Sequence, residues 1–189
     1  KIIEMGKKEG INITCEATPH HFSFSDDEIL KNAYDTNFKM SPPLREISDV
    51  KAVREALKSG LIDVIATDHA PHHTDEKIVE FDKAPFGIIG LQTLVPLTLK
   101  LVNEGVISLE RMVELTSTNA AKMLNLKDKG RLAEGMLADV AVIDPEIEYV
   151  YDEKINRSKS INSPLFGKKL KGAATTTIKS GKIVYEFGK

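Results

Sequence analysis

The sequence predicts an α/β protein whose second part consists of short β-strands. Two observations predict the α/β part. Residues 61–66 are typical of a strand buried on both faces, because Val64, Ile65 and Ala66 are consecutive apolar residues, and residues 48–58 before them carry apolar side chains at helical spacing. The third observation is a change of pattern after Gly130, where short apolar runs alternate with turn residues. We therefore assign residues 1–125 to the α/β part and residues 126–189 to the β part.

The first half of the α/β part should contain two helix–strand units. The expected elements are a helix at 2–8, a strand at 11–17 that ends in 18–21, a helix at 48–58 and a strand at 61–66. Gly10 and Gly60 can end the two helices, and Ser48 can cap the start of the second. In parallel α/β sheets, functional groups gather at the carboxyl ends of the strands. The segment after residue 66 is therefore the first place to look for a site.

Two further helices are expected before the β part. Residues 91–102 are apolar almost all round, as in a helix packed on several sides, and Pro96 should bend this helix or restrict it to an early turn. Gly105 can end this helix, and the next begins at Ser108. We expect the last helix to bury one apolar face in the core, made of Leu109, Met112, Val113, Thr116, Ala120, Met123 and Leu124.

The β part should contain three short strands. We expect a strand at 139–144, closed by Pro145, and a β-hairpin whose strands lie at 175–178 and 182–185. The part has about 64 residues, near the lower limit for an independent core. It should therefore pack on other strands.

Composition excludes several classes of protein. The chain has 189 residues, of which 41% are hydrophobic and 29% charged, as in ordinary soluble domains, and its formal net charge of −2 leaves no basic surface for nucleic acid. Cys15 is the one cysteine, which excludes an internal disulfide and Cys-rich zinc modules and suits the reducing cytoplasm. No apolar run reaches about 18 residues and no signal peptide is seen, so neither a membrane span nor secretion is indicated.

The polar residues that could carry chemistry follow the expected strand at 61–66. All five histidines lie within the first 73 residues, near expected strand ends; for His20, His21, His69 and His73 a structural role is the commoner explanation. Asp68 and His72 differ. An Asp at the end of a buried strand costs stability unless a cation or hydrogen-bond donors compensate it, so a metal ion is a reasonable partner, and beside one the carboxylate can take a proton from water. The alternative for Asp68 is a turn or helix-capping role before Pro71.

A family resemblance is carried by six segments in a fixed order. Residues 67–72 (TDHAPH) resemble the second signature of the dihydroorotases, in the cyclic amidohydrolase superfamily. The other segments, which look like landmarks of the same family, are residues 16–21, 39–45, 85–91, 135–139 and 162–167. The resemblance covers essentially the whole chain, and its most specific part is the Asp-His-Ala-Pro-His run.

The resemblance implies a zinc-dependent (β/α)8 barrel that interconverts dihydroorotate and N-carbamoyl-aspartate in pyrimidine biosynthesis. The chain would be the C-terminal part of that TIM-type barrel, with strands 7 and 8 and their helices, followed by part of a small flanking β-sandwich domain. Asp68 matches the metal-binding residue that also serves as catalytic acid or base. His72 matches a residue that binds the substrate carboxylate, and Phe86 with Gly87 match a substrate-contacting loop.

Two departures from the family pattern bear on these expectations. Ser41 stands where the family commonly has an Asn that contacts the substrate, and a serine hydroxyl has a shorter reach. The family's His-x-His pair, its bridging Lys or Asp and two further histidines would all lie before Lys1. Of the binuclear zinc site, these residues would supply Asp68 alone, and we expect the isolated chain to be inactive.

Three alternatives remain open. A related cyclic amidohydrolase would act on a hydantoin or allantoin, which lacks the carboxylate that His72 would bind. A catalytically silent scaffold would instead assemble with aspartate transcarbamoylase, and a homo-oligomer is compatible with the sequence. A metal-binding module of His69, His72 and His73 is the weakest alternative, because Pro71 makes their convergence on one ion awkward.

Overall fold

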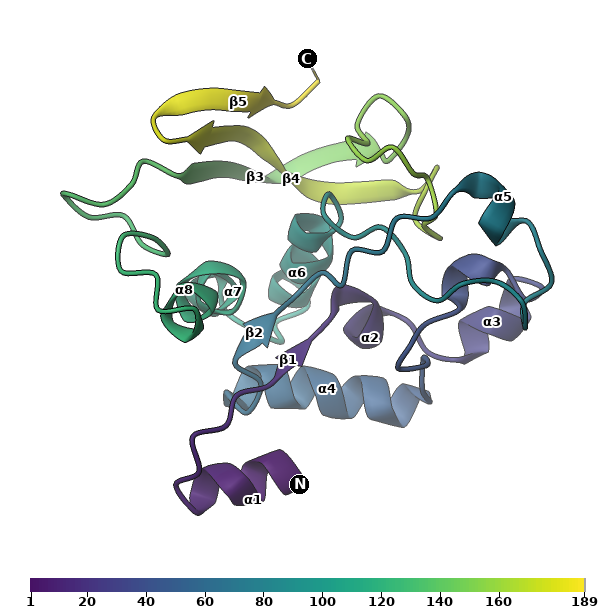
Figure 1. Ribbon diagram of the computed structural model, residues 1–189, viewed down its shortest axis with the longest axis horizontal. Coiled ribbons are helices and arrows are strands. Elements are labelled where there is room, and N and C mark those ends of the chain that lie inside the picture. The colour runs from purple at the N-terminus through teal and green to yellow at the C-terminus, as the bar shows by residue number, and fades with distance from the viewer. Residues whose placement is uncertain (189) are drawn as a thin grey trace.

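The computed structural model describes residues 1–188 and has mixed α/β architecture, as the sequence predicts. Figure 1 shows a three-stranded sheet at one end, α1 at the other, and the remaining helices around a short parallel pair of strands. The helices are α1 (Ile2–Lys8), α2 (Pro19–Ser23), α3 (Asp27–Lys31), η1 (Thr36–Phe38), α4 (Ile47–Ser59), α5 (Thr74–Lys77), α6 (Leu94–Asn103), α7 (Leu109–Val113), the π-helical η2 (Glu114–Thr118) and α8 (Asn119–Met123). The strands are β1 (Glu16–Ala17), β2 (Val64–Ile65), β3 (Val140–Val150), β4 (Lys169–Lys179) and β5 (Lys182–Glu186).

The parallel pair β1–β2 is much shorter than the runs at 11–17 and 61–66 suggest. Glu16 pairs with Val64 and Ala17 with Ile65. Just before the pair, the Cys15 amide donates to a side-chain oxygen of Asp63 at 2.9 Å, in place of a backbone carbonyl. That carboxylate also binds the Lys7 ammonium, with a shortest N–O distance of 2.7 Å. The Asp63 amide in turn donates to the Cys15 carbonyl at 3.0 Å, so the two backbones remain joined here while the Asp63 side chain takes the Cys15 amide. The regular pairing comprises only the two residue pairs that follow.

The helices between the strands follow the sequence closely, with one error at a cap. The helix α4 confirms the prediction for 48–58, and Gly60 ends it with φ 84°, a left-handed conformation suited to glycine. The N-cap is Glu46, two residues before the expected Ser48, and its side chain makes no capping bond. In α6, Pro96 lies in the first turn, where a missing N–H costs no helical hydrogen bond, as predicted.

The apolar face expected after Ser108 is only partly correct. Met112 and Leu115 are buried, but Leu109, Val113, Met123 and Leu124 are all at least 44% exposed. For Met123 and Leu124 the π-turn η2 is the physical reason, because its wider turn rotates the residues that follow it away from the face set by α7. Leu109 and Val113 precede η2 and lie on the exposed side of α7 itself. After η2 the buried position is Ala121.

The sheet has the order β3–β4–β5, antiparallel throughout. The hairpin of β4 and β5 confirms the expectation for 175–185. The prediction that Pro145 closes the preceding strand is wrong, since β3 continues to Val150. Pro145 is tolerated because it lies in a register shift between Asp144 and Glu148, and within residues 1–188 β3 pairs with β4 alone.

Two buried clusters hold the elements together. The larger joins α4, α6 and α7 to the parallel pair and includes Leu57, Leu99 and Leu115. The smaller consists of Phe38, Met40, Leu44 and Ile88, and it lies under the segment that follows α5. Within residues 1–188 no helix is long and apolar enough to cross a membrane.

Candidate functional site

Asp68 follows β2 by three residues and presents an unpaired carboxylate. Its backbone has φ 48°, in the left-handed region, which costs a non-glycine residue about 1–2 kcal/mol and which Asp tolerates better than most. The residue is exposed, and within the described residues its side chain has no hydrogen-bond or ion-pair partner. No hydrogen-bond donor of the described residues compensates this carboxylate, and a metal ion as its partner stays a prediction. What the structure offers is an accessible carboxylate on a locally strained backbone, a combination often found at functional positions.

The segment that carries Asp68 runs beside residues 86–90. His69 and Ile88 form an isolated parallel bridge, and the Ala70 amide donates to the Ile88 carbonyl at 2.9 Å. The Gly90 amide donates to Nδ1 of His69 at 3.0 Å, and burial lowers the pKa of His69. This nitrogen is thus already occupied. The side chain of His69 ties the two segments together.

His72 contacts the second segment directly. Its Nε2–H donates to the Phe86 carbonyl at 2.9 Å, and its side chain keeps 24% exposure. On the other edge of the ring, Nδ1 lies 3.7 Å from a carboxylate oxygen of Glu76. The structure therefore brings together two of the predicted substrate-binding positions, His72 and the 86–87 loop.

Gly87 is required where the two segments touch. Its φ is 97°, and a Cβ at this position would lie 2.6 Å from Cβ of Ala70. The Gly87 amide donates to the Lys39 carbonyl at 2.9 Å. The preceding residue, Phe86, is 54% exposed, and the Lys39 ammonium lies 4.7 Å from the centroid of its ring. The loop thus offers an accessible aromatic ring with a cation over it.

Ser41 is exposed on the segment that continues from Lys39. The Ser41–Pro42 peptide bond is cis. The Pro42 carbonyl accepts from Nε2–H of His21 at 2.9 Å, and Nδ1 of His21 lies 2.6 Å from the Thr18 hydroxyl. Ser41 is thereby placed on a segment that touches the 86–87 loop through Lys39, whereas no contact joins it to Asp68 in the part of the chain that the structure describes.

The remaining histidines have structural surroundings. His20 is 3% exposed, and burial, together with the neighbouring His21 ring, lowers its pKa to about 3. His73 is the N-cap of α5, where its Nδ1 accepts from the Asp75 amide at 3.3 Å while Glu76 accepts from the His73 amide.

Two buried polar residues at this site were missed by the sequence reasoning. Asn162 is 4% exposed and Lys77 is 7% exposed, and both donate to carbonyls of the 85–87 loop. Burial lowers the pKa of Lys77 to about 8, with the charge of Lys39 acting in the same direction and that of Asp35 against it. Residues 162–167 stood out as a family landmark, but nothing local in the sequence indicates a partner 92 residues away.

The fit of this site to a metal ion rests on Asp68. Among residues 1–188, no three or more His, Cys, Asp or Glu side chains are grouped so that they could hold a metal. The module of His69, His72 and His73 considered above is therefore not formed. The free carboxylate oxygens of Asp68 are suitable zinc ligands, so the residue fits the role of one ligand in a larger set.

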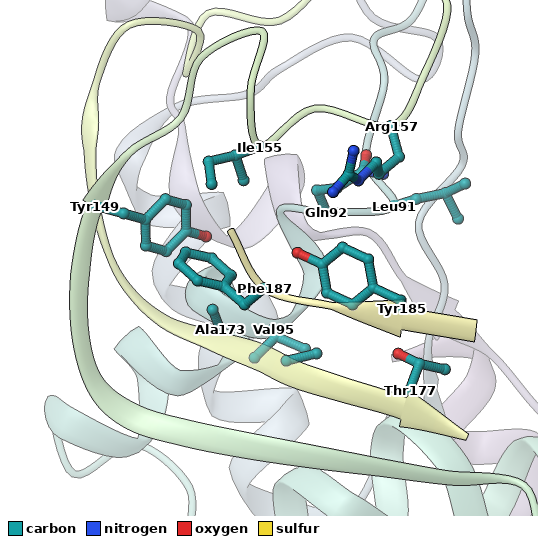
Figure 2. A pocket seen from close by; sticks show the side chains of 11 residues that line it. Leu91, Gln92, Val95, Tyr149, Ile155, Arg157, Ala173, Thr177, Tyr185 and Phe187 are labelled. Carbon is teal, nitrogen blue, oxygen red and sulfur yellow. The ribbon is translucent and has the colours of Figure 1, made fainter. Parts of the chain in front are cut away.

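Two cavities lie away from Asp68. Figure 2 shows one of about 190 Å³, walled by the aromatic rings of Tyr149, Tyr185 and Phe187, with Gln92 and Arg157 on its rim. The other lies between α6 and residues 165–171. Neither is lined by a residue that the sequence predicts for the site.

Comparison with known proteins gives one family throughout. The Amidohydrolase family matches residues 8–184. The dihydroorotase of Geobacter metallireducens is 51% identical over 186 residues, and that of Geotalea daltonii is 50% identical over 186 residues. Each alignment covers 98% of this chain and 43% of the relative. The chain thus spans less than half the length of these relatives.

Solved structures agree on the fold. The L-hydantoinase (dihydropyrimidinase) of Arthrobacter aurescens superimposes with a TM-score of 0.92 at 32% identity, covering 100% of this chain and 42% of that chain. A D-hydantoinase (dihydropyrimidinase) from Thermus sp. gives a TM-score of 0.85 at 27% identity, covering 99% of this chain and 42% of that chain.

Proposed function

Because this chain belongs to the amidohydrolase family, we propose that the protein it forms is a dihydroorotase, which reversibly hydrolyses dihydroorotate to N-carbamoyl-aspartate in pyrimidine biosynthesis. The observation that carries this proposal is the identity of about 50% to proteins named dihydroorotase over nearly the whole chain. These relatives confirm the resemblance seen in the sequence. The activity belongs to the complete protein, since the chain spans 43% of their length.

The fold supports assigning this chain to the C-terminal part of a barrel. We assign β1 and β2, with the helices around them, to strands 7 and 8 of a (β/α)8 barrel, and β3–β5 to part of a flanking β-sandwich. Residues 1–125 would form the barrel portion and residues 126–189 the flanking portion. The parallel pairing of β1 with β2 and the antiparallel order of β3–β5 both support this assignment.

Asp68 is assigned the proton transfers of the reaction. In hydrolysis, the oxygen of water bonds to the ring amide carbon, the carbon–nitrogen bond breaks, and the nitrogen leaves with a proton. The Asp68 carboxylate takes the proton from water and returns it to the leaving nitrogen. Its exposure and its lack of a partner within residues 1–188 leave both carboxylate oxygens free for this task.

The substrate is assigned to the surfaces beside Asp68. His72 would bind the carboxylate of dihydroorotate in its doubly protonated form, in which Nδ1–H donates to the ligand while Nε2–H remains bonded to Phe86. The Phe86–Gly87 loop would lie against the ring, where Gly87 allows close approach of backbone. Ser41 would add one hydrogen bond from its exposed hydroxyl.

The metal of this enzyme is proposed to be zinc in a binuclear site. Asp68 would be one ligand, and the others would come from sequence upstream of Lys1. Bound zinc supplies a Lewis acid that polarises the amide carbonyl and makes water a stronger acid. The donor atoms of Asp68 suit this ion.

A hydantoinase is the second candidate, favoured by the TM-score of 0.92 to the L-hydantoinase. The two substrates differ in ring size, six atoms against five, and in one charged group, because a hydantoin ring lacks the carboxylate that His72 would bind. A third candidate is a silent scaffold bound to aspartate transcarbamoylase, which would make no use of Asp68. In all three cases we place the protein in the cytoplasm, and it could assemble as a homo-oligomer.

The test uses the protein encoded by the complete gene, assayed with dihydroorotate, hydantoin and allantoin, with and without a zinc chelator. We expect chelator-sensitive hydrolysis of dihydroorotate. Asp68→Asn should lower kcat by about 10²- to 10⁴-fold, the usual effect of removing a positioned acid–base group. His72→Ala should raise the KM for dihydroorotate by about tenfold or more, the loss expected for one hydrogen bond to a charged group.

Asp128→Asn is the matched control, because Asp128 is exposed and lies away from this site. Normal turnover in Asp68→Asn would overturn the catalytic assignment. Hydrolysis of hydantoin in preference to dihydroorotate would favour the second candidate. Absence of both activities, with a stable complex with aspartate transcarbamoylase, would favour the scaffold.

A further inference from the structure

Asn162 reaches from the connection between β3 and β4 to the two loops beside Asp68. Its side-chain Nδ2–H donates to the Ala70 carbonyl at 2.9 Å and to the Gly87 carbonyl at 3.4 Å. Its Oδ1 accepts from the His72 amide at 3.2 Å. Its own backbone carbonyl accepts from the Ile89 amide at 3.1 Å. One residue therefore binds both loops at once.

The chemistry of the amide side chain suits this position. A primary amide is both an acceptor and a double donor, which is what one amide N–H and two carbonyls require. The residue is 4% exposed, so water cannot easily replace these bonds. An aspartate would turn both donors into acceptors facing carbonyl oxygens, and an alanine would remove all three of these side-chain bonds.

The Gly87 carbonyl is held from a second side as well. The Lys77 ammonium, from the end of α5, donates to it at 3.2 Å and to the Pro85 carbonyl at 2.9 Å. Two buried side chains, separated by 85 positions in the sequence, thus converge on one peptide group of the loop. The orientation of that peptide is set by both.

We propose that Asn162 is a positioning residue that sets the spacing between His72 and the Phe86–Gly87 loop, and so determines substrate affinity. This inference rests on the proposed function, because it takes these two elements to be the substrate-binding surface. Asn162 itself contacts no substrate. It acts through the His72 amide and the Gly87 carbonyl, and Asp68 makes no contact with it in the described chain.

The test compares Asn162→Ala, Asn162→Gln and Asn156→Ala in the protein encoded by the complete gene. Asn156 is the matched control, because its side-chain amide, like that of Asn162, donates to two backbone carbonyls. These belong to Ser158 and Ser160, in its own segment, and not to the two loops. Asn162→Ala should raise the KM for dihydroorotate about tenfold or more, with kcat changed by less than about threefold. Asn162→Gln, which keeps the amide, should recover part of the loss, and Asn156→Ala should leave KM within about twofold.

Hydrogen exchange of the same variants gives a readout that does not depend on the substrate. The amides of Ala70, His72 and Ile89 should exchange faster in Asn162→Ala than in the wild type, and at the wild-type rate in Asn156→Ala. Unchanged KM and unchanged exchange in a folded Asn162→Ala would overturn the inference. If the wild type does not hydrolyse dihydroorotate, the proposed function fails, whereas the exchange measurement still decides whether Asn162 holds the loops. If Asn162→Ala does not fold, the same two measurements on Asn162→Gln decide. The longer side chain moves the amide group by one methylene, so a wild-type KM together with wild-type exchange rates in Asn162→Gln would contradict the inference.

Discussion

The five histidines differ in what their ring nitrogens contact. A ring nitrogen of His21 is bonded to the Pro42 carbonyl, a ring nitrogen of His69 accepts from the Gly90 amide, and His73 caps a helix. His72 alone combines a bond to the 86–87 loop with partial exposure. The structural explanation preferred from the sequence for the other four therefore agrees with their surroundings. A local pattern cannot distinguish such roles, because the contacts of His21 with Pro42 and of His69 with Gly90 each span 21 residues.

His20 should make the protein sensitive to acid. Its pKa in the folded state is about 3, below the value of about 6.5 for an unfolded chain. As the pH falls below about 6.5, the unfolded state binds a proton that the folded state does not, so stability is lost, by up to about 1.4 kcal/mol per pH unit. Above that pH the contribution is constant. Urea unfolding at pH 7 and pH 5 should show a smaller loss in His20→Gln than in the wild type.

The exposed Asn12 provides the comparison for this measurement, since its replacement by Gln removes no titratable group. Asn12→Gln should show the same loss between pH 7 and pH 5 as the wild type. An equal pH dependence in His20→Gln and the wild type would mean that His20 titrates normally in the folded protein.

At the scale of elements, the sequence was most informative where structure is local. The helix α4, the early-turn Pro96 and the hairpin of β4 and β5 all follow from short-range patterns. The length of β1 and β2 did not follow from the sequence, because the Asp63 side chain takes the Cys15 amide that would extend the regular pairing. The π-turn η2 has no sequence signature, and it changes the direction of the residues that follow it, Met123 and Leu124 among them. Both errors arise where a side chain or a turn alters the regular backbone hydrogen bonds.

The contact between the Asp68 segment and the 86–90 segment should depend on Gly87. In Gly87→Ala the new Cβ would lie 2.6 Å from the Ala70 Cβ, which has no rotamer to move aside. We expect the free energy of unfolding to fall by about 1–2 kcal/mol from the left-handed φ and by about 1–3 kcal/mol more from the clash. The KM for dihydroorotate should rise with it. Chemical denaturation and steady-state kinetics measure the two effects.

Gly105→Ala separates conformational strain from the clash. Gly105 has φ 69°, but no atom lies within 4 Å of the position that its new Cβ would take. It should therefore show only the loss due to the left-handed conformation. Equal losses of stability in the two variants, with normal KM in Gly87→Ala, would mean that the two segments can separate without cost.

At the scale of the whole molecule, the sheet packs closely on the helical part where β4 crosses α6. Gly172 of β4, with φ 85°, lies over α6, and a Cβ there would lie 2.3 Å from Cδ1 of Leu99. Leu99 is 1% exposed and belongs to the main core. Figure 1 shows α6 directly beneath the sheet. The close approach of backbone to a core side chain therefore sets the distance between the two parts.

Gly172→Ala should weaken this junction. We expect a loss of about 1–3 kcal/mol in the free energy of unfolding beyond that of Gly181→Ala, since Gly181 has φ 78° and open space around it. Adding Leu99→Ala should relieve the overlap, so the two substitutions should be non-additive when unfolding is followed by circular dichroism. Strict additivity would show that Gly172 and Leu99 are not coupled.

The candidate site could be predicted only in part, because some of its contacts join residues that are far apart in the sequence. Asp68, His72 and the 86–87 loop lie within 20 residues of one another, and two short motifs, residues 67–72 and 85–91, reveal them. Asn162 and Lys77, which hold that loop, were not predicted, because their function arises from contacts that only the folded chain creates. The exposure of Asp68 likewise depends on the course of the backbone after β2.

The reach of Asn162 across 92 residues also has a consequence for biosynthesis. A ribosome adds about 5–20 residues per second, so Ala70 emerges on the order of ten seconds before the side chain that will hold it. During that interval the loops can pair with each other through Ala70 and Ile88 but lack their final tether. The contact that holds the two loops together is therefore completed only after residue 162 has been made, and a nascent chain that stalls before it would carry the Asp68 motif with its loops untethered.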